Sequence, residues 1–175
     1  MQSNNLYFEP LTTVPADNFF AIITTLSLLA FIEPKNPLTL EELKATHSIR
    51  ENSSVNLITP SEQWFNMATY LKDGAATAIG LFEATSYGSW GEIAYLLDDA
   101  WWGRELGFEA MEWWHKYLEI AEPGLEWWAT VYPENQRSIG LLKRLGYEEV
   151  DSTRRSQLQS YDLGDRCFVR SVKVS

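Results

Sequence analysis

The spacing of apolar residues changes along the chain between two patterns, one typical of β-strands and the other of α-helices. Mostly apolar runs of strand length are separated by segments in which apolar residues recur at every third or fourth position. Strands are expected at residues 6–11, 64–71, 75–84, 92–97, 125–131, 147–155 and 166–174, and helices from about residues 15, 39, 105 and 135. The predicted fold class is therefore a mixed α/β domain of about seven strands and four helices. No linker divides the chain, so residues 1–175 are expected to form one domain.

Two of the expected strands, 64–71 and 75–84, flank the sequence Lys72-Asp73-Gly74. An Asp-Gly pair between two strands favours a tight hairpin turn, because both residues tolerate the backbone conformation that such a turn requires. We therefore expect these two strands to pair antiparallel.

The helix expected from residue 15 is apolar on almost every side, which is typical of a helix at the centre of a molecule or over a site. Its large apolar residues are Phe19, Phe20, Ile23, Leu26, Leu29 and Phe31. The run is too short to cross a bilayer, so no membrane anchor is predicted. The short helix that follows is expected to begin at Thr39, which forms a capping-box pattern with Glu42.

The stretch 91–110 predicts a strand, a tight loop and the start of a helix. Residues 92–97 form an apolar run of strand length, residues 98–103 have the composition of a turn, and helical spacing begins at Glu105. The first N–H groups of a helix have no partner inside it and point outward at the positive end of the helix dipole. This stretch therefore predicts a site for an anion such as a phosphate.

A second stretch carries Pro133, Asn135 and Ser138 in the pattern Pro-x-Asn-x-x-Ser, followed at 145–147 by Leu-Gly-Tyr. This pattern resembles a motif of the GNAT (GCN5-related) N-acetyltransferase superfamily. The stretch 91–110 is similar to the acetyl-coenzyme A (acetyl-CoA) loop of the same family, with Tyr-x-Leu, Trp-Gly and Glu-Ala in that order. The resemblance extends over residues 6–174 and is closest to the branch of ribosomal-protein-alanine N-acetyltransferases.

The resemblance implies a central, mostly antiparallel sheet in which the strands at 92–97 and 125–131 splay apart to receive the pantetheine arm of acetyl-CoA. The backbone of Leu96 and Leu97 would bond this arm, and Asn135 and Ser138 would meet the thioester end. The loop would cradle the pyrophosphate through its backbone amides, and Arg104 would add positive charge. The loop residues are Gly103, Arg104, Glu105, Leu106, Gly107 and Phe108. Lys143 is a further candidate for binding the cofactor.

The resemblance also implies catalytic roles. An amine acceptor is an ammonium at neutral pH and must lose a proton before it attacks a thioester. Glu92 lies where many family members carry the general base for this step. Many members also carry a tyrosine, seven residues after the motif asparagine, that protonates the leaving thiolate; here that position is Leu142. Ser138 is then expected to donate instead, as in the ribosomal-protein branch, with help from the helix N-terminus.

Each of these residues also has an ordinary structural interpretation. Glu92 could be an exposed strand glutamate, Asn135 a helix cap, and Ser138 a residue bonded only to backbone. Lys143, near a helix C-terminus, is favourable there without any ligand. Glu105 stands where the family usually has a glycine, so its carboxylate is expected to point away from a bound pyrophosphate.

The leading expectation is an acetyl-CoA-dependent N-acetyltransferase that acts on a primary amine by direct attack. The acceptor stays open between a protein N-terminus, a polyamine and another small amine such as an amino-sugar antibiotic. Leu142 and Glu105 leave open a second function, that of a non-catalytic domain that binds or senses CoA on the same fold.

The charge composition of the chain limits the kinds of partner that it is expected to bind. The chain has 14 Lys plus Arg against 24 Asp plus Glu, a formal charge of −10. Binding to nucleic acid needs a basic face, so no nucleic-acid partner is expected, whereas a cationic acceptor suits this charge.

Cys167 is the only cysteine and no export signal is visible, so a reducing, cytoplasmic location is expected. His47 and His115 lack metal-ligand spacing, so no metal is expected. The protein is expected to be a monomer or a homodimer.

Overall fold

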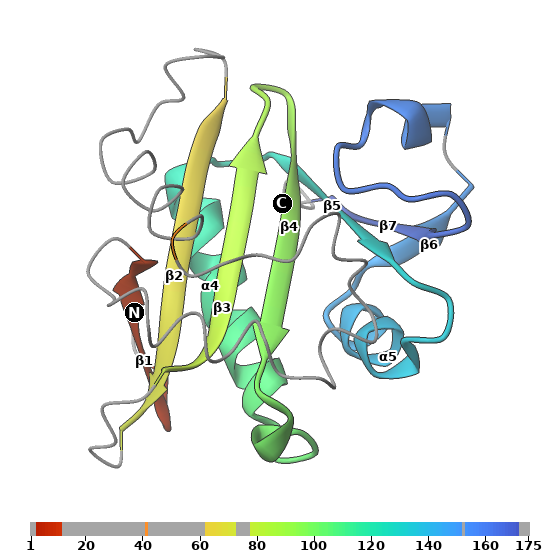
Figure 1. The fold of residues 1–175 in the computed structure, drawn as a ribbon. Coiled ribbons are helices and arrows are strands. Elements are labelled where there is room, and N and C mark those ends of the chain that lie inside the picture. The colour runs from red at the N-terminus through yellow and green to blue at the C-terminus, as the bar shows by residue number, and fades with distance from the viewer. Residues whose placement is uncertain (1–2, 12–40, 42–61, 73–77, 152, 172–175) are drawn as a thin grey trace.

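A computed structural model describes residues 3–11, 41, 62–72, 78–151 and 153–171. These residues contain a seven-stranded sheet of order β1-β2-β3-β4-β5-β7-β6 (Figure 1). All neighbouring strands pair antiparallel except β4 and β5, which are parallel. The strands are β1 (Leu6–Pro10), β2 (Gln63–Leu71), β3 (Ala78–Ser86), β4 (Trp90–Leu97), β5 (Glu126–Val131), β6 (Glu148–Val150) and β7 (Arg166–Arg170). The prediction of a mixed α/β fold with a mostly antiparallel sheet of seven strands is confirmed.

The described residues contain two α-helices, α4 (Leu106–Ala121) and α5 (Gln136–Arg144). They also contain the short 3₁₀ helices η2 (Asp99–Trp101) and η3 (Thr153–Gln157). Four α-helices were expected, and the two expected from residues 15 and 39 fall almost entirely outside the described residues. The antiparallel pairing of β2 with β3 is confirmed, although the hairpin turn at 73–77 also lies outside them.

The strand expected at 147–155 is too long. β6 ends at Val150, and the chain then forms η3, in which Arg154 and Arg155 pair with carboxylates of other segments. Arg154 lies 3.0 Å from Glu126 of β5, and Arg155 lies 3.0 Å from Asp151. Charged residues with no apolar alternation cannot bury one face of a strand, so ion pairs and a tight turn replace the ladder here.

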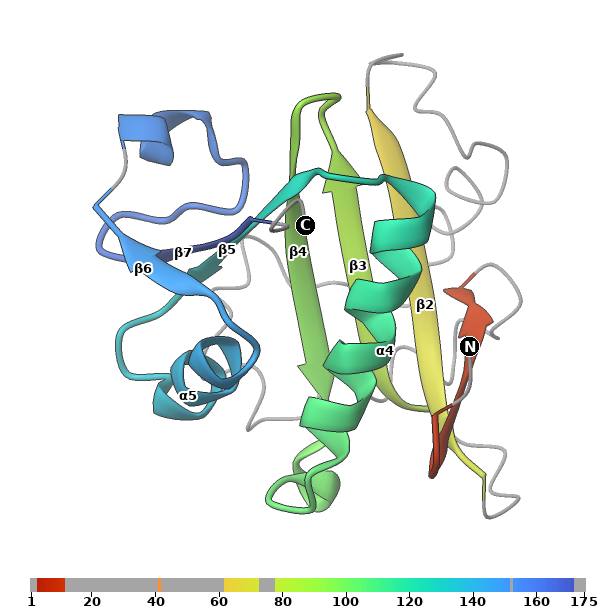
Figure 2. The ribbon, with the colours of Figure 1, turned by 180° about the vertical axis from the view of Figure 1, so that it is seen from behind.

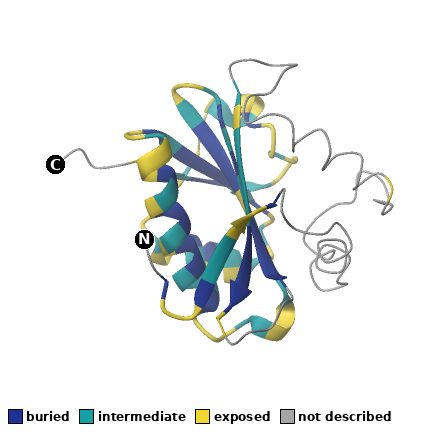
Figure 3. Ribbon diagram, turned by 90° about the vertical axis from the view of Figure 1, so that its left-hand side faces the viewer, coloured by how far each residue is buried: buried dark blue, intermediate teal, exposed yellow. Residues whose placement is uncertain are grey.

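The core lies between α4 and the sheet, because α4 crosses one face of β2, β3 and β4 (Figure 2). The apolar residues of α4 recur on one side of the helix and are buried against the strands, as Figure 3 shows. Trp114 of this helix is fully buried and lies 6.3 Å, between ring centroids, from Phe82 of β3. This packing fixes the position of the β4–α4 connection.

The parallel pair β4–β5 separates soon after it begins. Trp90, Gly91 and Glu92 pair with residues of β5, and no pairing continues beyond Glu92 and Trp128. Gly91 allows the close approach, since a Cβ atom there would lie 2.3 Å from the Trp127 ring. We call the separated segments, residues 93–97 of β4 and 129–131 of β5, the fork. Figure 1 shows the two strands diverging there, with α5 following β5.

Candidate active site

The N-terminus of α4 is open to a ligand. Glu105 occupies the cap position, but its side chain makes no capping hydrogen bond to the helix. The N–H groups of Leu106, Gly107 and Phe108 belong to the first turn, whose donors have no carbonyl partner within the helix. α5 differs, because the Asn135 side chain accepts a hydrogen bond from its first turn. The uncapped start of α4 therefore suits an anion, as the sequence predicted.

Glu105 itself has a strained backbone. Its φ is 61°, the only positive φ among the described non-glycine residues, and this left-handed region favours glycine. Its side chain is 70% exposed and forms a bidentate pair with Arg144 of α5, with N···O distances of 3.2 and 2.5 Å. The hydrogen bond and charge of Arg144 lower the pKa of this carboxyl. The glutamate that stands in place of the family's usual glycine is thus turned to the surface and paired with a cation.

Arginines from two segments lie beside this loop. The guanidinium of Arg104 lies 5.0 Å from the centroid of the Trp101 ring. From α5, Arg137 lies 4.5 Å from the Trp102 ring, and Arg144 lies 4.6 Å from the Phe108 ring. Gly103, with a φ of 71°, contributes no side chain to this surface.

Sequence reasoning did not select Arg137 and Arg144 as cofactor ligands. They are seven residues apart, which is about two helical turns, so both lie on the same side of α5. This spacing was visible in the sequence and could have identified them as a pair facing the loop.

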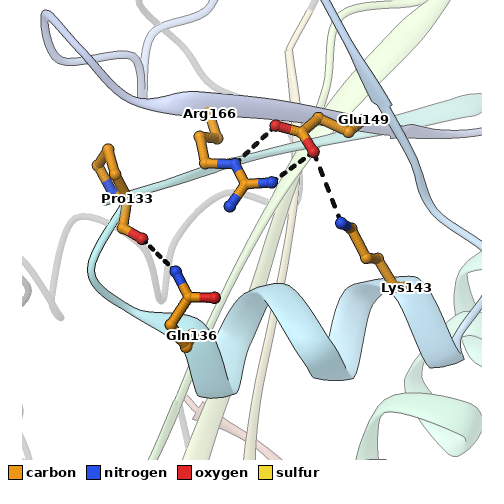
Figure 4. A network of polar contacts seen from close by, with 5 residues as sticks. All are labelled: Pro133, Gln136, Lys143, Glu149 and Arg166. Carbon is orange, nitrogen blue, oxygen red and sulfur yellow. Dashed lines mark hydrogen bonds and ion pairs between the residues drawn. The ribbon is translucent and has the colours of Figure 1, made fainter.

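Lys143, which was selected, has partners elsewhere. Figure 4 shows its ammonium directed at Glu149 of β6, with an N···O distance of 3.6 Å. The same carboxylate accepts two hydrogen bonds from Arg166 of β7, and this interaction lowers the pKa of Glu149. At the other end of α5 in this view, Gln136 donates to the carbonyl of Pro133. Lys143 thus links α5 to β6 and β7, and its contacts give it no connection to the β4–α4 loop.

The carbonyl of Leu97, at the end of the fork, already accepts a hydrogen bond from Trp102 Nε1 at 2.7 Å. A carbonyl oxygen has a second lone pair, so Leu97 can still accept from a ligand amide. Leu96 precedes it and pairs with Leu81 of β3, and its side chain packs against the buried cluster that contains Leu81. Both residues therefore pair with β3 but not with β5, and the predicted contacts with the pantetheine arm would form on the side of β4 that faces β5.

Ser138 and Asn135 lie in the first turn of α5. The Asn135 Oδ1 atom accepts a hydrogen bond from the Ser138 amide at 3.1 Å, so Asn135 does cap the helix. The Ser138 hydroxyl lies 2.6 Å from the hydroxyl of Tyr95, on β4. Burial raises the pKa of Tyr95 to about 12, against the opposing effect of its hydrogen bond to Ser138. The two hydroxyls connect β4 and α5 at the fork. Tyr95 entered the sequence analysis only as part of the Tyr-x-Leu pattern.

Glu92 is buried, with 6% of its surface exposed, so it is not an exposed strand glutamate. Its two carboxylate oxygens accept hydrogen bonds from the amides of Gln159 and Ser160, at 2.8 and 2.9 Å. Thr130 of β5 holds the same segment by donating to the Ser160 carbonyl at 2.7 Å. Glu92 therefore fastens the loop between η3 and β7 to the strands at the base of the fork.

Glu92 and Tyr95 project from opposite faces of β4, because side chains alternate along a strand. Tyr95 faces the core under α4, whereas Glu92 faces the side that carries Gln159 and Ser160. On the Glu92 side, burial and, to a smaller extent, the charges of Glu92 and Glu62 raise the pKa of Tyr87 to about 12. Because Ser138 bonds to Tyr95, the two predicted catalytic residues, Glu92 and Ser138, approach the fork from different sides of β4.

The described part of the chain contains no cluster of three or more His, Cys, Asp or Glu side chains arranged to hold a metal ion. None of its helices has the length and apolar character needed to cross a membrane.

The family model described as an acetyltransferase (GNAT) domain matches residues 5–148. No curated protein sequence matches the chain closely enough to count as a relative.

Many solved structures share the fold. A domain from Methanocaldococcus jannaschii DSM 2661 has a TM-score of 0.74 at 17% identity, covering 98% of this chain and 100% of its own. An acetyltransferase from Agrobacterium tumefaciens str. C58 has a TM-score of 0.73 at 14% identity, covering 97% and 92% of the two chains. A Vibrio cholerae protein, provisionally described as a ribosomal-protein-serine acetyltransferase, has a TM-score of 0.69 at 15% identity, covering 97% and 95%. The family match spans most of the chain and the fold agrees with it, so the chain belongs to the GNAT acetyltransferase family.

Proposed function

We propose that the protein transfers the acetyl group of acetyl-CoA to a primary amine by direct attack, as an N-acetyltransferase. The observation that carries this proposal is the fork. Its two strands stop pairing after Glu92, the uncapped N-terminus of α4 lies at the end of β4, and the Tyr95–Ser138 hydroxyl pair connects its two sides. Acetyl-CoA would use all three features together. The separated strands would receive its arm, the helix N-terminus its phosphates and the hydroxyl pair its thioester.

The residues present fit acetyl-CoA. The first-turn amides of α4 can donate to a pyrophosphate, and Arg104, Arg137 and Arg144 lie around the same loop. Glu105 does not oppose this binding, because its carboxylate is exposed and paired with Arg144. The backbone of Leu96 and Leu97 would align the pantetheine arm. When bound, the co-substrate supplies the activated acetyl group.

In the proposed reaction the amine nitrogen attacks the thioester carbonyl, the C–N bond forms, and the C–S bond breaks with its electron pair going to sulfur. Ser138 is proposed to donate a hydrogen bond to the sulfur as negative charge develops there. Glu92 is proposed to accept the amine proton, directly or through a water molecule. Each Glu92 oxygen already accepts one amide hydrogen bond, so the proton would go to a remaining lone pair of the carboxylate.

The acceptor is proposed to be cationic. The formal charge of −10 favours the approach of an ammonium over that of an anionic substrate. A protein N-terminus is the first candidate, because the motifs resemble the ribosomal-protein branch and one structural neighbour is assigned to a related activity. Polyamines and small amino compounds are the other candidates. A cytoplasmic location is part of the proposal and is compatible with the single buried Cys167.

The second candidate function is a non-catalytic domain that binds CoA. The observation that favours it is the double amide bonding of Glu92, which gives this residue a structural role independent of any proton transfer. In that case acetyl-CoA would bind at the fork without turnover.

A panel of amines separates the two functions. Purified protein is mixed with acetyl-CoA and, in turn, with peptides of different N-terminal residues, polyamines and amino sugars, and free thiol is followed over time. Thiol release that needs both an amine and the wild-type protein supports the transferase, and Ser138→Ala is the matched variant expected to slow it. Binding of acetyl-CoA without amine-dependent thiol release from any acceptor would favour the second candidate.

A further inference from the structure

We propose that Tyr95 is a positioning residue for acetyl transfer, whose hydroxyl orients the Ser138 side chain so that the serine proton points at the leaving sulfur. The inference rests on the proposed function and adds to it a residue of β4 that makes the serine an effective donor.

The contact itself is specific. The Tyr95 Oη atom lies 2.6 Å from Ser138 Oγ and 3.4 Å from the Ser138 carbonyl oxygen, so both of these polar contacts are with one residue. The Tyr95 ring is stacked at 15° to the Phe82 ring, with centroids 6.4 Å apart, in the core under α4. A ring held by core packing thus presents its hydroxyl to the first turn of α5, across the fork.

The direction of the short bond follows from acidity. A phenol is a stronger acid than an aliphatic alcohol and hence the better hydrogen-bond donor, so we infer that the single O–H of Tyr95 points at Ser138 Oγ, at 2.6 Å, and not at the more distant Ser138 carbonyl oxygen, at 3.4 Å. The proton of Ser138 is then free for another acceptor, and the lone pair used by Tyr95 limits rotation of the hydroxyl. Because burial raises the pKa of Tyr95 to about 12, the phenol keeps its proton throughout the neutral range.

The position that usually carries the family's tyrosine cannot supply this hydroxyl. Leu142 of α5 occupies it, and its side chain is completely buried in the core. A tyrosine hydroxyl instead reaches the same helix from the opposite strand. The fold therefore retains a phenol near the start of α5 although its position in the sequence is different.

In the proposed step, Ser138 donates a hydrogen bond to the leaving sulfur and does not transfer its proton to it. A thiol has a pKa of about 8.5, far below that of Tyr95 or of an alcohol, so a thiolate would not take a proton from either group outright. As the C–S bond breaks, the electron pair moves to sulfur and the Ser138 O–H donates a hydrogen bond to it. The thiolate later takes a proton from solvent, and the amine proton leaves to the base.

The test measures the thiol pKa of bound CoA, which does not depend on turnover. The pH of a solution of protein saturated with CoA is varied, and ionisation of the thiol is followed by the ultraviolet absorbance of the thiolate. Donors that stabilise the thiolate should lower this pKa by about one unit in the wild type. In Tyr95→Phe, which keeps the ring, the thiol pKa should return at least halfway to its value in free CoA. In Ser138→Ala it should return to that value completely. The double variant should match Ser138→Ala. Tyr147→Phe is the control, since it removes a buried hydroxyl bonded to His115 and should leave the bound thiol as in the wild type.

Kinetics give a second readout. Tyr95→Phe should lower kcat about 10- to 100-fold while the KM for acetyl-CoA changes less than about 3-fold, as expected for an interaction made mainly in the transition state. If CoA binds but Tyr95→Phe or Ser138→Ala leaves its thiol pKa at the wild-type value, Tyr95 has no positioning role. If CoA does not bind to the wild type at all, the proposed function fails, and this inference fails with it.

Discussion

Glu105 has an unfavourable backbone conformation, but its side chain leaves the proposed phosphate site open. Its left-handed conformation, with a φ of 61°, is unfavourable for any residue with a Cβ atom. The bidentate pair with Arg144 turns the carboxylate away from the first-turn amides of α4. The carboxylate is exposed and paired with Arg144, and its orientation away from a bound pyrophosphate stays a prediction. The backbone strain was not visible in the sequence.

Replacing Glu105 by glycine should therefore destabilise the protein less than replacing it by alanine, although both changes remove the pair with Arg144. Glu105→Gly should melt about 2–4 °C above Glu105→Ala, because both lose the carboxylate but only glycine removes the strain. CoA affinity should rise by less than about 10-fold in both variants. Calorimetric titration checks this, and a gain of 100-fold or more would mean that the native carboxylate faces the phosphates.

Glu92 has two possible roles, which can be separated by one substitution and its control. Glu92→Gln should lower kcat about 100-fold or more and leave CoA affinity nearly unchanged, if the carboxylate accepts the amine proton. Thr130→Val is the control, because it removes the other side-chain anchor of the same loop without touching Glu92. Similar losses of kcat in both variants would assign Glu92 to anchoring the loop and would place the base elsewhere.

His115 should make stability depend on pH. Its Nδ1 atom lies 2.6 Å from the Met111 carbonyl, which can only accept, so Nδ1 carries the hydrogen and Nε2 accepts from Tyr147 at 2.8 Å. Burial, with a smaller effect from Arg170, lowers the pKa of His115 to about 3. Below about pH 6.5 only the unfolded chain gains this proton, so folding stability should fall by up to about 1.4 kcal/mol per pH unit on acidification toward pH 3.

Urea unfolding of wild type and His115→Gln between pH 7 and 4 measures this effect, since the variant cannot titrate at this position. The stability of the wild type relative to the variant should decrease as the pH falls. Curves that stay parallel over that range would show that His115 is not the group responsible.

At the scale of elements, the charged residues of α5 make two separate sets of contacts. Arg137 and Arg144 contact the aromatic rings of the β4–α4 segment, while Lys143 joins Glu149 and Arg166 at the sheet. Proximity to the motif made Lys143 a candidate ligand, but the helical rotation between positions 143 and 144 sends the two side chains in different directions.

This division predicts different effects on cofactor affinity. Arg137→Ala should weaken CoA binding about 10-fold, because it removes a cation beside the proposed phosphate site. Lys143→Ala should change affinity by less than about 2-fold, since it disturbs only a partly exposed pair of α5 with β6. Isothermal titration of both variants with CoA tests the assignment. A larger loss from Lys143→Ala than from Arg137→Ala would restore Lys143 as the ligand.

At the scale of the whole molecule, apolar periodicity was sufficient for most elements of the described chain, but not for β6, which is shorter than expected. It placed β1, β4, β5, α4 and α5 within a few residues of their observed bounds. The fork came from the resemblance to a family, because no local pattern shows that two parallel strands stop pairing after three residues each. Contacts between distant backbone and side chains could not be predicted. The amides that hold Glu92 lie 67 and 68 residues away in the sequence, and the loop that supplies them was expected to be an ordinary polar loop.

The central claim is that this fold moves an acetyl group to an amine. The most direct measurement is mass spectrometry of a cationic acceptor, such as a peptide with a free N-terminus or a polyamine, after incubation with acetyl-CoA and purified protein. We expect one added acetyl group on the amine nitrogen, formed in step with free CoA and much more slowly by Ser138→Ala. Acetyl-CoA that binds tightly but leaves every acceptor unmodified would contradict it.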